Sequence, residues 1–184
     1  MRLFRNSLLL AAAGLFALAI PLAAQQAATQ PSRSSMSANQ RAADYLNTVN
    51  QTEIDTAKMM QDHSQNDQVK DFAKMLQDDH QNAQNQLQTA ASQSKIDLNT
   101  NAALKKASDT LDNRLKNDSA SQADRSYLAA EVRDHKTAIN RLKMMEGQVT
   151  DAQIKGAIDA ALPLMQKHLD AAQKLQSQLG LSGK

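Results

Sequence analysis

Four long stretches of the sequence place apolar residues at intervals of three and four, which is the spacing of one face of an α-helix. They cover residues 37–63, 66–93, 119–146 and 150–180. Each opens with a residue that commonly caps a helix N-terminus, and glycines mark the end of the last two. Aromatic residues make up only 3% of the chain, and cysteine is absent. A sheet-rich or disulfide-stapled fold therefore does not fit, and the sequence predicts an all-α protein.

The apolar stripes of these stretches predict the core. In chain order they are Ala42, Leu46, Val49, Ala57 and Met60; Val69, Phe72, Leu76, Ala83 and Leu87; Tyr127, Leu128, Ala138, Leu142 and Met145; and Ile154, Ile158, Ala161, Met165, Ala172, Leu175 and Leu179.

The segment between the second and third stretches, residues 94–118, contains a shorter amphipathic helix through Leu104, Leu111 and Leu115. Four long helices with one long connection match the ferritin type of bundle. We therefore expect a ferritin-like four-helix bundle with a long helical crossover between the second and third long helices.

The N-terminus has the three parts of a secretory signal peptide. Arg2 and Arg5 precede an apolar run over residues 8–20, and small residues follow up to Ala24. The run is shorter than the roughly 20 residues that a membrane span requires, although an uncleaved anchor is the alternative interpretation. We expect a signal peptide at residues 1–24, a disordered linker at 25–36 and a bundle domain at 37–184. Export would place the protein in the periplasm, at the outer membrane or in the medium, with no transmembrane span after cleavage.

The charge balance argues against nucleic acid as a partner. The chain has 21 Lys and Arg against 19 Asp and Glu, and the signal peptide holds two of the arginines and no acid. The remaining domain is neutral and has no basic stripe with interleaved aromatic residues. A nucleophile motif and a glycine-rich phosphate loop are also missing, so the sequence favours a protein that is not an enzyme. Protein partners and oligomeric state stay open.

Two segments 55 residues apart repeat one pattern. Residues 72–87 and 127–142 each start with an aromatic residue, and an Asp-His pair follows seven and eight positions later. Both helices therefore present the pairs Asp79-His80 and Asp134-His135 at the same phase.

Four polar residues interrupt the predicted core stripes at a similar depth. Counted at 1.5 Å per residue along ferritin-type helices, they lie roughly 18–24 Å from one end of the bundle. These residues are Glu53, His80, His135 and His168. Imidazoles and a carboxylate from separate helices can hold a transition metal ion such as Zn, Fe, Cu or Mn.

Three acids beside this set, Asp79, Asp134 and Glu131, are candidates for further ligands or for acceptors that orient the histidines. Neighbouring helix residues point about 100° apart, so we expect such an aspartate to reach across to another helix. The alternative is a purely structural hydrogen-bond network. A di-iron ferroxidase centre is not expected, because Gln77, Val132 and Met165 stand where Glu-x-x-His motifs require glutamate.

Three segments carry a resemblance to a known family: NDQVKDFAKMLQDDHQNAQNQL, DRSYLAAEVRDHKTAINRL and ALPLMQKHLDAA. With them the chain resembles, over about residues 38–180, the exported bacterial family called domain of unknown function 4142. The resemblance implies a ferritin-like fold and a location outside the cytoplasm, and it implies no established activity. Three functions fit: a non-catalytic binding or stress-associated protein, a metal-binding protein for sequestration or redox chemistry, and a helical interaction module.

Cleavage of the signal peptide is the first testable expectation. Intact-mass measurement of the exported protein should give a chain that begins after Ala24. Retention of Met1 in the exported protein would contradict it.

Overall fold

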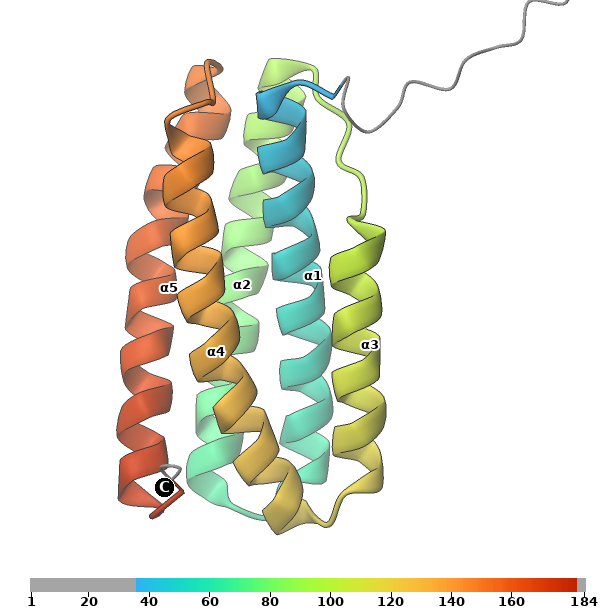
Figure 1. The fold of residues 1–184 in the computed structure, drawn as a ribbon, viewed down its shortest axis with the longest axis vertical. Helices are drawn as coiled ribbons and strands as arrows, with labels where there is room; N and C mark the ends of the chain where they lie inside the picture. Colours follow the sequence, from blue (N-terminus) through green and yellow to red (C-terminus); the bar gives the residue numbers. More distant parts are fainter. Residues whose placement is uncertain (1–35, 182–184) are drawn as a thin grey trace, which may run out of the picture.

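The computed structural model describes residues 36–181, which form five α-helices and no strand. The predicted signal peptide, and the linker up to residue 35, lie outside the described residues. The helices are α1 (Ala38–His63), α2 (Asp67–Ser94), α3 (Ala102–Asn117), α4 (Ala120–Glu146) and α5 (Ala152–Gln178) (Figure 1). The prediction of an all-α protein is confirmed.

The helices begin where short polar side chains satisfy the free N–H groups of the first turn. Ser37 accepts from the Gln40 amide, Asn66 from the Gln68 and Val69 amides, and Asp151 from the Gln153 and Ile154 amides. At the start of α4, Ser119 and Gln122 hydrogen-bond to each other. These caps explain why the helix starts follow closely from the sequence.

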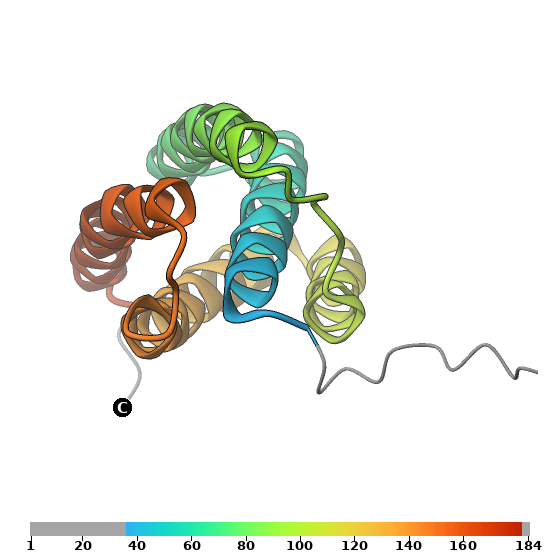
Figure 2. The ribbon, with the colours of Figure 1, turned by 90° about the horizontal axis from the view of Figure 1, so that it is seen from above.

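The four long helices lie side by side, and α3 lies on the outside (Figures 1 and 2). The most extensive contacts join α1 to α2, α4 to α5 and α2 to α5, so these helices surround a common interior. α3 packs more lightly on α1 and α4, and Leu115 is its only fully buried residue. Among the described residues, no helix is long and apolar enough to cross a lipid bilayer.

The core consists of two apolar clusters separated by a layer of polar side chains. One cluster is built around Leu46, Leu142 and Ile158. The other is built around Met60, Leu76 and Tyr127. On α2 the buried polar residues His80 and Gln84, and on α4 the buried polar residues Glu131 and His135, lie between the positions that belong to the two clusters. The interior therefore changes from apolar to polar and back along the length of the bundle.

Three predicted core positions are only half-buried in the structure. Ala83 is only half-buried, and its neighbour Gln84 is 4% exposed instead. Gln84 can face inward because both ends of its amide are hydrogen-bonded, to Asn50 and to Asn47. Met145 and Leu179, at the ends of their helices, are also half-buried.

Truncation of one leucine in each apolar cluster should be costly. Leu76 and Leu142 are both 0% exposed, so Leu76→Ala and Leu142→Ala should each lower the free energy of unfolding by about 2–4 kcal/mol. Chemical denaturation measures this change. Met144→Ala is the matched control, because Met144 is 66% exposed and its loss should cost less than about 0.5 kcal/mol. Equal effects at all three positions would contradict the division into core and surface.

Candidate metal centre

Three of the chain's four histidines meet in the polar layer. His80 comes from α2, His135 from α4 and His168 from α5, and each is at most 2% exposed. The centroids of the three rings lie 5.0 to 6.0 Å apart. One nitrogen from each ring lies within 4.8 Å of the other two. The fold thus brings together three imidazoles that are 33 to 88 residues apart in sequence.

Each imidazole is held from its outer side by a hydrogen-bond acceptor. His80 Nδ1 lies 3.0 Å from Asn50 Oδ1, and His135 Nδ1 lies 3.0 Å from the backbone oxygen of Glu131. His168 Nε2 lies 2.9 Å from Asp79 Oδ2. Asp79 thus reaches across from α2 to α5, as the helical geometry predicts. A backbone oxygen and a carboxylate can only accept, so His135 and His168 carry their protons on these outer nitrogens.

A chain of hydrogen-bonded amides determines which nitrogen of His80 carries the proton. The backbone oxygen of Asn99, in the α2–α3 loop, accepts from Asn47, and the side-chain oxygen of Asn47 accepts from Gln84. Gln84 in turn accepts from the Asn50 amide nitrogen, which leaves the Asn50 oxygen for His80. Because the chain starts at an acceptor that cannot donate, every amide in it has one satisfactory orientation. His80 therefore also carries its proton on Nδ1.

The inner nitrogens of the three rings are consequently left without protons. His135 Nε2 and His168 Nδ1 face each other at 3.3 Å, and His80 Nε2 is buried with no hydrogen-bond partner. A neutral imidazole has one N–H, and in each ring it is already used on the outer side. Two bare nitrogens thus face each other, and the unpartnered nitrogen of His80 belongs to a ring of the same buried group, which is an arrangement that a cation would stabilise.

Burial makes a proton a poor candidate for that cation. It lowers the pKa of His80 well below 6.5, and the nearby charges of His168 and His135 act in the same direction. The pKa of His168 falls to about 4, because burial outweighs the hydrogen bond to Asp79. Partial burial would raise the pKa of Asp79, but hydrogen bonds from Lys167 and His168 lower it overall. Around neutral pH, His80 and His168 are therefore neutral and Asp79 is charged.

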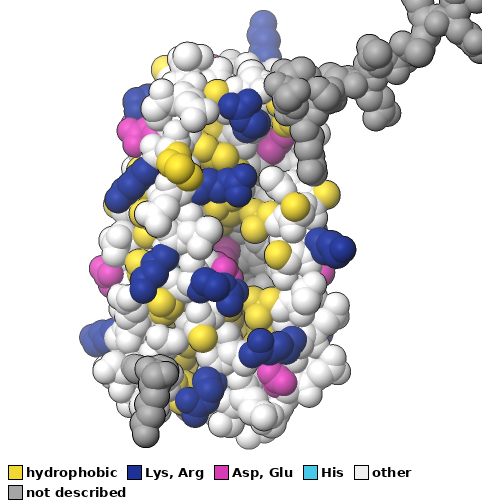
Figure 3. Space-filling view, in the orientation of Figure 1, with side chains coloured by type: hydrophobic (Ala, Val, Ile, Leu, Met, Phe, Trp, Pro, Cys, Tyr) yellow, Lys and Arg dark blue, Asp and Glu magenta, His cyan; other side chains and the backbone are white. Residues whose placement is uncertain are grey.

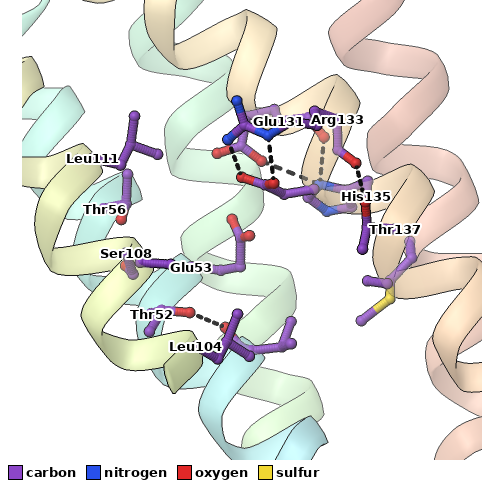
Figure 4. Close-up of a pocket in the computed structure, with 15 residues that line it drawn as sticks. Thr52, Glu53, Thr56, Leu104, Ser108, Leu111, Glu131, Arg133, His135 and Thr137 are labelled. Carbon is purple, nitrogen blue, oxygen red and sulfur yellow. Dashed lines mark hydrogen bonds and ion pairs between the residues drawn. The ribbon is translucent and has the colours of Figure 1, made fainter. Parts of the chain in front are cut away.

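Two glutamates lie on the other side of the His135 ring. Glu53 of α1 and Glu131 of α4 form a second group with His135, whose ligand atoms lie within 4.8 Å of one another. Figure 4 shows the Glu53 side chain pointing toward Glu131 and His135. Glu131 Oε2 lies 3.2 Å from His135 Nδ1, yet it has no hydrogen-bond partner, and neither does the buried Tyr127 hydroxyl. The pair is thus an incompletely satisfied polar group inside the bundle.

Burial also keeps a proton on this pair. It raises the pKa of Glu131 to about 8. The pKa of Glu53 is raised well above its ordinary 4.5, first by burial and then by the charge of Glu131. Two carboxyls this close cannot both ionise easily in an apolar setting.

A cavity of about 250 Å³ between α1, α3 and α4 reaches the glutamate pair and His135. On the face drawn in Figure 3, the surface is hollowed between α3 and α4. Asp134 lies in the wall of this cavity, where Arg133 holds it through two contacts of 2.9 Å. It is half exposed and makes no hydrogen bond to a histidine.

The structure therefore separates the predicted site residues into two groups. His80, His135 and His168 form one, with Asp79 as an outer acceptor, while Glu53 joins Glu131 beside it and Asp134 faces the cavity. Sequence reasoning missed Asn50 and Gln84. Both could have been found, because Asn50 lies four residues after Leu46 and Gln84 four after His80, on the inward faces of their helices.

The raised pKa values of the glutamates predict how the stability of metal-free protein depends on pH. Between their unfolded and folded pKa values the folded chain binds protons that the unfolded chain releases, so stability falls as pH rises toward 8. His80 and His168 oppose this trend only below about pH 6.5, where the unfolded histidines take up protons. The free energy of unfolding should thus be about 1–2 kcal/mol higher at pH 6.5 than at pH 8.

Denaturation in the presence of a chelator measures this difference. Glu131→Gln should reduce the pH dependence, because glutamine does not titrate. Metal-free wild-type protein that is more stable at pH 8 would contradict the assignment.

Comparison with known proteins identifies the family. A family model described as "Domain of unknown function (DUF4142)" matches residues 22–175. No curated protein and no solved structure matches the chain. The family match covers well over half of the 184 residues, so the chain belongs to the DUF4142 family.

Proposed function

We propose that the protein binds a transition metal ion between His80, His135 and His168. The observation that carries this proposal is a set of three buried imidazoles with one nitrogen each within 4.8 Å of the others, whose protons are held by acceptors on their outer sides. Ligating histidines usually donate their second nitrogen to a carboxylate, a carbonyl or another acceptor, which orients the ring and makes it a better ligand. The contacts to Asn50, Glu131 and Asp79 have this form.

The spacing of the nitrogens supports the same interpretation. Zn–N bonds of about 2.0–2.1 Å in tetrahedral geometry place two ligand nitrogens about 3.3 Å apart. The nitrogens of His135 and His168 are 3.3 Å apart, and His80 comes within 4.8 Å of both. Three imidazoles suit Zn, Cu, Ni, Co or Fe, and we take Zn²⁺ as the reference ion.

A purely structural network explains the outer contacts but not the inner ones. Such a network would place an N–H between His135 Nε2 and His168 Nδ1, which requires one ring to give up its outer hydrogen bond or to take a second proton. If His135 gave up its bond, its bare Nδ1 would face the Glu131 backbone oxygen at 3.0 Å, and if His168 gave up its bond, its bare Nε2 would face the Asp79 carboxylate at 2.9 Å. Both arrangements place two acceptors against each other, which is unfavourable. The lowered pKa of His168 disfavours the second proton.

The proposal also covers the type of bundle and the place where the ion is bound. We take α1, α2, α4 and α5 as a ferritin-like four-helix bundle, with α3 in the long crossover between the second and third long helices. This interpretation is supported by the helix order and by the contacts that link the four helices. We further propose that residues 1–24 direct export, so that a bundle domain over residues 37–184 binds its metal outside the cytoplasm, as a binding protein and not as an enzyme.

Metal content tests the central proposal. Protein produced without an affinity tag and dialysed against Zn²⁺ should retain about one ion per chain, and the double variant His80→Ala, His135→Ala should retain none while staying helical. His63→Ala is the matched control, because His63 ends α1 away from the three rings and contacts the Asp118 backbone oxygen. Occupancy should persist below pH 6.5 and decrease only as the pH approaches about 4, because burial lowers the pKa of His80 and His168 and so delays the competition between protons and the ion.

Inductively coupled plasma mass spectrometry gives the content, and circular dichroism checks the fold. Wild-type protein that takes up none of Zn²⁺, Co²⁺, Ni²⁺ or Cu²⁺ would eliminate the metal site and leave the structural network.

A further inference from the structure

The histidine site is buried, and two cavities reach the polar layer around it. The first, of about 250 Å³, lies between α1, α3 and α4 and is lined by Glu53, Glu131 and His135. The second, of about 340 Å³, lies between α1, α2 and α5, and Asn50 and Asp79 are in its lining. The two cavities approach the polar layer from different sides.

The second cavity meets only the outer acceptors of the histidines. Asn50 is hydrogen-bonded to His80 and Gln84, and Asp79 is bonded to both Lys167 and His168. These polar groups are already satisfied, and an ion arriving there would have to break the contacts that orient the rings. No histidine side chain lines this cavity.

The first cavity differs in both respects. His135 itself lines it. Glu131 also lines it and is only 3% exposed, yet its buried Oε2 atom has no hydrogen-bond partner. The Tyr127 hydroxyl, 0% exposed, is a second unpartnered oxygen next to this group. Carboxylate oxygens are ligands for divalent cations. The wall of the cavity also carries hydroxyl groups, from Thr56 and Ser108 among others (Figure 4).

We infer that Glu53 and Glu131 form an uptake site, where a divalent transition metal ion from the α1–α3–α4 cavity is first bound and then passed to the three histidines. The inference rests on the proposed histidine site. His135 links the two stages, because its Nδ1 faces Glu131 and its Nε2 faces His168. The hydrogen bond that orients His135 comes from the backbone oxygen of Glu131, so a change in the Glu131 side chain leaves it in place.

The test is the rate at which the metal-free full chain takes up Co²⁺, followed by stopped-flow absorption as imidazoles bind the ion. The double variant Glu53→Gln, Glu131→Gln should load at least about ten-fold more slowly than wild type and reach the same final content of one ion per chain. Glu146→Gln is the matched control, because Glu146 ends α4 outside both cavities and pairs with Lys155. Its loading rate should equal that of wild type.

A second pair of variants tests the route itself. Ser108→Trp places a large ring in the first cavity and should slow loading, whereas Ala160→Trp, at the second cavity, should not. The reverse result would overturn the inferred route.

Unchanged rates in the glutamine variant overturn the uptake site but leave the histidine site standing. Loss of the ion at equilibrium also overturns it, since the glutamates would then be permanent ligands. Wild type that binds no Co²⁺ refutes the histidine site and the uptake site together.

Discussion

The interior of this protein is organised by the direction of three hydrogen bonds. Asn50, the Glu131 backbone and Asp79 each accept a hydrogen bond from the outer nitrogen of an imidazole, and that direction leaves the inner nitrogens without protons. Burying such groups is unfavourable unless they have partners, so the polar layer constrains the helices that supply them. α1 contributes no histidine to the layer, yet it supplies Asn47 and Asn50 and is thereby held in register with α2.

The polar layer also divides the core into two apolar clusters. The two apolar clusters on either side supply the burial that holds a cysteine-free domain together, and the layer between them contributes little of that burial. Each long helix contributes residues to both clusters, so packing on both sides fixes the positions of the helices that carry the polar layer. A site built on rigid helices in this way holds its side chains more precisely than one built on loops.

Much of this architecture could be predicted from the sequence, because helical periodicity and capping residues are local signals. The stripe of α2 predicted Leu76 and His80 as inward-facing, and both are buried. Apolarity alone favoured Ala83 over Gln84, because the amide partners that let Gln84 face inward lie on another helix. Counting residues along helices likewise predicted one level for Glu53 and the histidines. It could not resolve the lateral offset that puts Glu53 with Glu131, since that depends on how the helices are rotated against one another.

The origins of the three acceptors bear on how the site can change over generations. The orientation of His80 traces back to the main-chain oxygen of Asn99, and His135 is held by the main-chain oxygen of Glu131. No codon change can delete a main-chain oxygen, so the anchor of His135 is insulated from mutation. The other two rings depend on side chains, because Asn50 supplies the acceptor for His80 and Asp79 supplies the acceptor for His168. Single nucleotide substitutions at Asn50 or Asp79 are therefore short routes by which selection could retune or abolish the centre.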